Sequence, residues 1–182
     1  MYDTYDEVVR YKAYQFPDNM NFDAGMVKVN SKGTKDINTG FQPANLHIRG
    51  AQQLINKETV RTFHKNDDGT EGDTTHGRSK GYATLDKDGN VIDQQSIGTA
   101  SNSHSTNGHR SLASDQDIIN TVYVDREGNE IGRFAAKITG ADSSGFTVDV
   151  NTKYTDNSNV ETDEVFLYRA WGFSYYEFDI GY

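Results

Sequence analysis

Three short turns set the strongest limit on how this chain can fold. Each combines a glycine that can adopt a positive φ with an acidic side chain that can accept hydrogen bonds from the backbone; the turns are Asp67–Gly69, Asp86–Asn90 and Asp125–Asn129. Apolar or alternating runs flank the second and third turns: Tyr82–Leu85, Val91–Ile92, Thr121–Val124 and Ile131–Phe134. These two segments are therefore predicted to be β-hairpins.

The strand pattern continues towards the C-terminus. Apolar and polar side chains alternate in Gly145–Val150, which predicts a strand with one apolar face. In Glu164–Trp171 both sets of alternate positions are largely apolar, so we expect a central strand covered on both faces, and Asn151–Asn159 is expected to be a polar connection. With 11 Tyr and 9 Phe between clusters of small polar residues, the chain is predicted to be an all-β protein, an antiparallel β-sandwich of about ten strands with extended arms at both ends.

The chain divides into a central domain and two arms. We expect an N-terminal arm over residues 1–20, the sandwich over 21–172 and a C-terminal aromatic strand or arm over 173–182. One face of the last segment carries Tyr176, Phe178, Ile180 and Tyr182, which can pair within their own sheet or act as an assembly contact on another subunit. The small, polar stretch Ile97–Ser114 is expected to be a loop, either mobile or held by its neighbours.

Composition excludes several classes of function. The chain has no cysteine, so thiolate metal sites, disulfides and cysteine nucleophiles are absent. Its 18 Lys and Arg are outnumbered by 27 Asp and Glu, giving a net charge of -9, which argues against nucleic acid as a partner. No apolar run is long enough for a membrane span, and residues 1–10 lack the basic and apolar parts of a secretory signal peptide.

The sequence contains no positive signal for catalysis. Gly72–Ser79 matches a phosphate-binding loop only superficially, because no apolar strand precedes it, and there is no nucleophile elbow. The spacing of the histidines fixes no metal site, and the acidic turns are better explained as hairpin turns than as calcium loops. We therefore predict no enzyme activity, cofactor or metal; the candidate ligand-binding residues are the polar loop residues His104, Asn107, His109 and Arg110.

Four segments occur in an order that resembles a class of small β-sandwich domains found in structural proteins of tailed viruses of bacteria and archaea. They are Ile37–Ile48 with its Thr-Gly-Phe-Gln-Pro run, Ser105–Arg110, Asp142–Val148 with its Gly-Phe-Thr-Val run, and Val165–Trp171. The resemblance covers about Phe22 to Trp171 and leaves out both ends of the chain. It implies a virion component, such as a capsid decoration, turret, tail, baseplate or fibre protein, and implies no activity. The motif residues themselves are expected to serve folding, because buried aromatic residues usually belong to the core.

The sequence leaves three candidate functions. The first is a non-enzymatic structural protein of a viral particle, made in the host cytoplasm, that assembles with copies of itself and with other virion proteins. The alternative is a lectin-like module that binds carbohydrate or a receptor on a virion or cell surface. The weakest is a hydrolase that uses two carboxylates, for which the sequence offers no particular pair.

Overall fold

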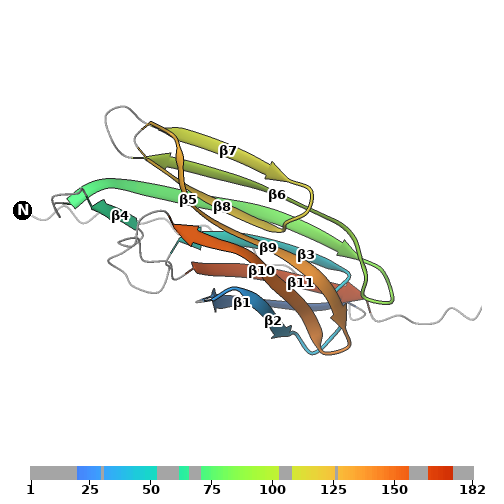
Figure 1. Cartoon of the computed structure of the whole chain (residues 1–182). Helices are drawn as coiled ribbons and strands as arrows, with labels where there is room; N and C mark the ends of the chain where they lie inside the picture. The colour runs from blue at the N-terminus through green and yellow to red at the C-terminus, as the bar shows by residue number, and fades with distance from the viewer. Residues whose placement is uncertain are drawn as a thin grey trace, which may run out of the picture.

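Two β-sheets pack face to face in this protein (Figure 1). The computed structural model describes residues 20–29, 31–52, 62–65, 71–102, 108–125, 127–155 and 164–173. Every regular element within these residues is a β-strand. In chain order the strands are β1 (Met20–Val29), β2 (Gly33–Asn38), β3 (Asn45–Gln52), β4 (Thr62–Lys65), β5 (Glu71–Leu85), β6 (Val91–Asn102), β7 (His109–Ser114), β8 (Ile119–Val124), β9 (Glu130–Asp142), β10 (Gly145–Thr155) and β11 (Glu164–Phe173).

The sheets differ in size. The larger sheet has the order β1-β11-β3-β5-β6-β7, with β4 also paired to β5, and the smaller has the order β2-β10-β9-β8. All of these pairs are antiparallel. The predicted antiparallel β-sandwich is therefore confirmed. Met20 pairs with Phe173, so each predicted arm contributes one residue to this ladder. The assembly residues Tyr176, Phe178, Ile180 and Tyr182 lie outside the described residues.

Both predicted hairpins are present, and the turn chemistry explains them. Asp86 Oδ1 accepts the backbone N–H groups of Asp88 and Asn90 at 2.9 and 2.8 Å, and Asp125 Oδ1 accepts the equivalent N–H groups of its turn at 3.0 and 2.7 Å. The glycines between them, Gly89 and Gly128, have φ values of 82° and 87°, which L side chains rarely adopt. The first turn joins β5 to β6 and the second joins β8 to β9.

The core lies between the sheets and follows the predicted alternation in β10. Phe146, Val148 and Val150 are buried, whereas the intervening Thr147 and Asp149 are partly exposed. The largest completely buried side chains come from both sheets; they include Phe134, Phe166, Leu46, Ile48 and Ile138. The core thus has the two inward faces that a sandwich requires.

Three expectations about particular segments are wrong in whole or in part. β11 has the expected central position, between β1 and β3, but its second face is only partly covered, because Val165 on that side is buried whereas Leu167 and Arg169 are exposed. The expected connection after Val150 continues β10 as far as Thr155, because β9 is long enough to pair with it beyond a bulge. The expected loop Ile97–Ser114 is mostly strand, since β6 and β7 pair from Ser96–Ser114 to Ser101–His109.

Strand β8 explains why small residues occur in β5 and β6. One edge of β8 pairs with β9, and the other edge faces the larger sheet, where the backbone N–H of Asn120 donates to Ser79 Oγ at 2.8 Å. A Cβ on Gly81 would lie 1.9 Å from the Ile118 carbonyl oxygen, and one on Gly98 would lie 1.8 Å from that of Asn120. Glycine therefore permits the close approach, and all six residues of β8 are buried.

Three of the four segments behind the viral resemblance, namely Ile37–Ile48, Asp142–Val148 and Val165–Trp171, are joined by backbone hydrogen bonds at one end of the sandwich. The backbone N–H groups of Thr39 and Gly40 donate to the Ser144 carbonyl at 2.9 and 3.0 Å, and Ala44 N–H donates to the Trp171 carbonyl at 3.0 Å. These bonds join the turn after β2 to the β9–β10 turn and to β11. The contacts support the folding role expected for these residues.

Candidate functional site

The candidate site is the side of the larger sheet that faces away from the smaller sheet, called here the outer face. Inward positions such as Leu46, Ile48 and Ala83 are buried, and the alternate positions between them are exposed. Register places outward residues of neighbouring strands side by side. One row across β11, β3, β5 and β6 contains Arg169, His47, Tyr82 and Gln95, and the next row contains Leu167, Arg49, Lys80 and Ile97.

Large apolar side chains gather on the outer face. Five of the six exposed large hydrophobic residues in the described part of the chain are here: Phe22, Met26, Tyr82, Ile97 and Leu167. Their exposed fractions run from 38% for Leu167 to 55% for Met26. Apolar groups concentrated on one side of a water-exposed protein commonly mark an interaction surface.

Positive charge gathers on the same face. Alternation and register place Lys28, Arg49, Arg78, Lys80 and Arg169 on it. Among the acidic side chains that the structure describes, only Asp93 has an outward position on these strands. The arginines and Lys80 make no ion pair with a described acidic residue. The outer face is therefore cationic although the whole chain has a net charge of -9.

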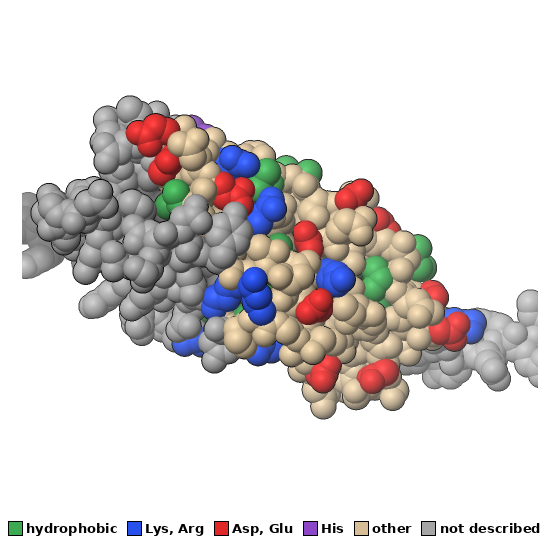
Figure 2. Space-filling view, in the orientation of Figure 1, with side chains coloured by type: hydrophobic (Ala, Val, Ile, Leu, Met, Phe, Trp, Pro, Cys, Tyr) green, Lys and Arg blue, Asp and Glu red, His purple; other side chains and the backbone are tan. Residues whose placement is uncertain are grey.

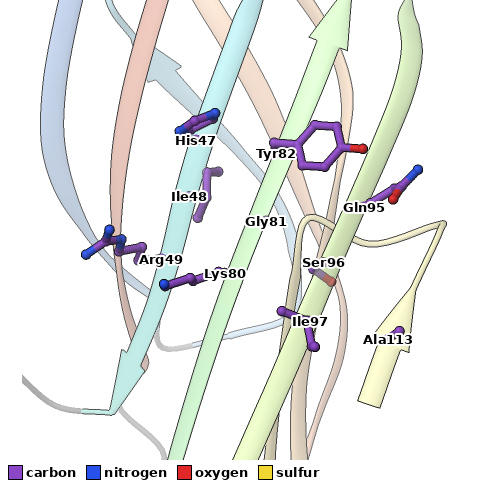
Figure 3. A pocket seen from close by; sticks show the side chains of 10 residues that line it. All are labelled: His47, Ile48, Arg49, Lys80, Gly81, Tyr82, Gln95, Ser96, Ile97 and Ala113. Atoms are coloured by element: carbon purple, nitrogen blue, oxygen red, sulfur yellow. The ribbon is translucent and has the colours of Figure 1, made fainter. Parts of the chain in front are cut away.

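Three shallow hollows lie along this face. The first, of about 440 Å³, has Arg49 and Lys80 on neighbouring strands near one side and Tyr82 beside Gln95 (Figure 3). The second, of about 430 Å³, shares His47 and Arg49 with the first and extends to Met26 and Leu167. The third, of about 540 Å³, is lined by residues of β5, β6 and β7: Arg78, Thr99, Ala100, Ser101, His109, Arg110 and Ser111. The hollows therefore follow the sheet from β1 to β7.

His47 and Tyr82 are the titratable groups of this face with perturbed pKa values. The His47 ring lies 4.7 Å from the Trp171 ring, centre to centre, in an edge-to-face arrangement. Burial, followed by the positive charges of Arg169 and Arg49, lowers the pKa of His47, so its imidazole is neutral at pH 7. Burial, followed by the charge and hydrogen bond of Asp93, raises the pKa of Tyr82, which leaves a phenol hydroxyl at neutral pH.

The ligand residues predicted from the sequence are only partly placed. His104 and Asn107 lie outside the described residues. His109 and Arg110 both line the third hollow; His109 is exposed, and the guanidinium of Arg110 lies 3.4 Å from the carboxylate of Glu130. Because these two residues are adjacent in β7, their side chains leave opposite faces of the sheet.

Sequence reasoning missed the outer face. The alternation of Arg78, Lys80 and Tyr82 along β5, and of His47 and Arg49 along β3, is visible in the sequence. Alternation shows that such residues share one side of their own strand, but it does not show that β3 and β5 are neighbours. Only the pairing of Arg49 with Lys80 and of His47 with Tyr82 makes these residues one surface.

Neither a metal centre nor a family assignment emerges. Within the described ranges, no group of three or more His, Cys, Asp or Glu side chains is arranged to hold a metal ion. The same part of the chain has no helix long and apolar enough to cross a membrane. Comparisons with protein-family models, curated proteins and solved structures give no match.

Proposed function

We propose that this chain is a non-enzymatic structural component of a viral particle that works by binding other subunits. The observation that carries the proposal is the outer face, where exposed apolar residues and cations lie side by side on one side of the larger sheet. Interfaces are enriched in aromatic residues, Met and Arg, and Tyr82, Met26, Arg49 and Arg169 supply these types. A sheet face of this composition suits docking onto another surface, since its hollows are broad and shallow.

The sequence resemblance supports the viral part of the proposal. The runs Thr39–Pro43 and Gly145–Val148 are typical of small virion sandwich domains, and they lie next to one another in the fold. A domain that serves as a building block needs rigid ends and accessible faces. The hydrogen bonds between these motifs supply the first requirement, and the outer face supplies the second.

Light scattering of the purified full-length chain tests this function. We expect the mass-averaged molecular weight to rise above the 20.4 kDa of a single chain as concentration increases. Deleting residues 176–182 should reduce this assembly if the C-terminal residues contribute to it.

A strictly monomeric chain at all concentrations would contradict the proposal.

The carbohydrate-binding alternative has its own support, because the aromatic ring of Tyr82 and the amide of Gln95 flank a hollow and are groups that suit a sugar. If the chain were monomeric and bound a neutral glycan in an array, with loss of the signal in Tyr82→Ala, that alternative would replace the structural role.

A further inference from the structure

The third hollow of the outer face is polar, unlike the opposite edge of the same sheet. It lies over β5, β6 and β7 and has a volume of about 540 Å³. The residues that line it from outward positions are Arg78, Thr99, Ser101, His109 and Ser111. Three exposed apolar side chains of the outer face belong instead to β1 and β11, at the far edge. The hollow is therefore separate from the most apolar part of the face.

Strand register brings the polar groups of the third hollow together. Arg78 lies directly across from Thr99, and Thr99 lies directly across from Ser111. Ser101 and His109 form the next pair of outward residues on β6 and β7. Side chains that face each other in an antiparallel ladder have Cβ atoms about 5 Å apart. One guanidinium, three hydroxyls and an imidazole therefore line a single space.

Contacts within the described part of the chain give these five side chains no other role. None of them has a side-chain hydrogen bond or an ion pair with another described residue. Arg110, which also lines the hollow, is different because its guanidinium lies 3.4 Å from the carboxylate of Glu130. Among the described residues, then, nothing competes with a ligand for the outward polar groups of the hollow.

Positive charge is concentrated beside the third hollow. Lys80 lies two residues from Arg78 on the same side of β5, and Arg49 lies directly across from Lys80 on β3 (Figure 3). Like charges that face each other in a ladder destabilise a sheet. These three cations make no ion pair with a described acidic residue, so pairing within the described strands does not account for them. A bound anion would offset their repulsion.

The opposite side of the sandwich is different. In Figure 2, where β9 and β10 are toward the reader, acidic and basic side chains are interspersed over the surface. The cations beside the hollow therefore form a local positive region on a chain whose net charge is -9. A chain with this net charge repels long polyanions, so the hollow suits a ligand with one or a few negative charges. Single-stranded nucleic acid needs a run of cations along its path, but Arg78 is the one outward Lys or Arg among the described lining residues.

We infer that the third hollow binds an acidic saccharide, that is, a sugar that carries a carboxylate or a sulfate group. The planar guanidinium of Arg78 can donate two parallel hydrogen bonds to either group. The hydroxyls of Thr99 and Ser111 can each donate or accept, which suits the hydroxyl groups of a sugar ring. The volume of about 540 Å³ lies within the usual range for small-molecule sites and is larger than a bare inorganic anion fills. This binding site goes beyond the proposed assembly function and does not depend on it.

A glycan array followed by calorimetry tests the inference on the full chain. The array presents neutral, carboxylated and sulfated oligosaccharides together with a single-stranded DNA oligonucleotide. We expect binding to the acidic saccharides, and the one that gives the strongest signal is then titrated into the wild type and the variants. Arg78→Ala removes the guanidinium and should weaken binding at least about tenfold. Arg78→Lys keeps the charge without the planar group, and Thr99→Val removes one hydroxyl; each should weaken binding about threefold.

Lys32→Ala and Thr34→Val are the matched controls. They remove the same kinds of group, a cation and a hydroxyl, from exposed positions just before and within β2 of the smaller sheet. Both controls should bind the acidic saccharide as the wild type does. Circular dichroism melting curves establish that all of the variants fold.

The outcomes separate the possible ligands. Binding only to carboxylated or only to sulfated saccharides would support the inference and identify the acidic group. Neutral saccharides bound as tightly as acidic ones, or unchanged affinity in Arg78→Ala, would overturn it. An array without binding to any acidic saccharide, or with tighter binding to the DNA oligonucleotide, would overturn it as well. Because light scattering tests assembly separately, each of these failures would leave the proposed assembly function standing.

Discussion

Replacing Gly98 by alanine should strongly destabilise the sandwich. Gly98 lies on β6 beneath β8, and an added Cβ would lie 1.8 Å from the carbonyl oxygen of Asn120. Ordinary contact starts at 3.4 Å, so the buried strand must move. Its φ lies outside the left-handed region, which makes the penalty steric rather than conformational. Overpacking of this kind costs about 3 kcal/mol of unfolding free energy. For a chain of this size that lowers Tm by roughly 6–12 °C.

Urea unfolding followed by circular dichroism measures this loss. Gly140→Ala is the matched control, because it also lies in a strand but an added Cβ would be 3.5 Å from its nearest neighbour, the carbonyl oxygen of Gly89. We expect the control to change stability by less than about 1 kcal/mol. If Gly98→Ala were as stable as Gly140→Ala, the close approach of β8 to the larger sheet would be refuted as the reason for glycine at this position.

Two further predictions concern hydrogen bonds. The Tyr168 hydroxyl donates to Asp23 Oδ2 at 2.7 Å, so Tyr168→Phe should cost about 1–2 kcal/mol in urea unfolding. Burial, then the hydrogen bond and charge of Asp23, raises the pKa of Tyr168 to about 12. The stability linked to the ionisation of Tyr168 is complete below pH 10 and is lost as pH rises through about 12. An absorbance titration in which no tyrosine ionises near pH 12 would contradict this. Hydrogen bonds from the side chain and then the backbone of Asn90 lower the pKa of Asp86 from its ordinary value of 3.8. The ionised Asp86 therefore contributes its full share of folding stability above pH 3.8, and this share is lost as pH falls through the lowered pKa. In Asp86→Asn the unfolding midpoint should fall less steeply than in the wild type as the pH is lowered into the acidic range. An unchanged slope would count against this role of Asp86.

Local chemistry made part of the fold predictable. The turns at Asp86 and Asp125 depend on side chains and glycines within five residues of each other, and alternation in β10 requires only its own sequence. The prediction of a loop at Ile97–Ser114 was wrong for a different reason. Small residues such as Gly98 and Ala100 suit a flexible connection, but in the fold they are small because β8 packs against them. That contact joins strands that are not adjacent in the sequence.

The same limit applies to the candidate site. His109 and Arg110 are expected to share a polar loop, but they lie in β7, where adjacent side chains point to opposite faces. Arg49, Lys80 and Arg169 are distant in sequence and become neighbours through the order β11-β3-β5. The sequence by itself determined the all-β class, the two hairpin turns and the two sides of β10, since these depend on short-range geometry. Only the tertiary structure decided which sides join into one cationic face, because strand order is set by long-range pairing and core packing.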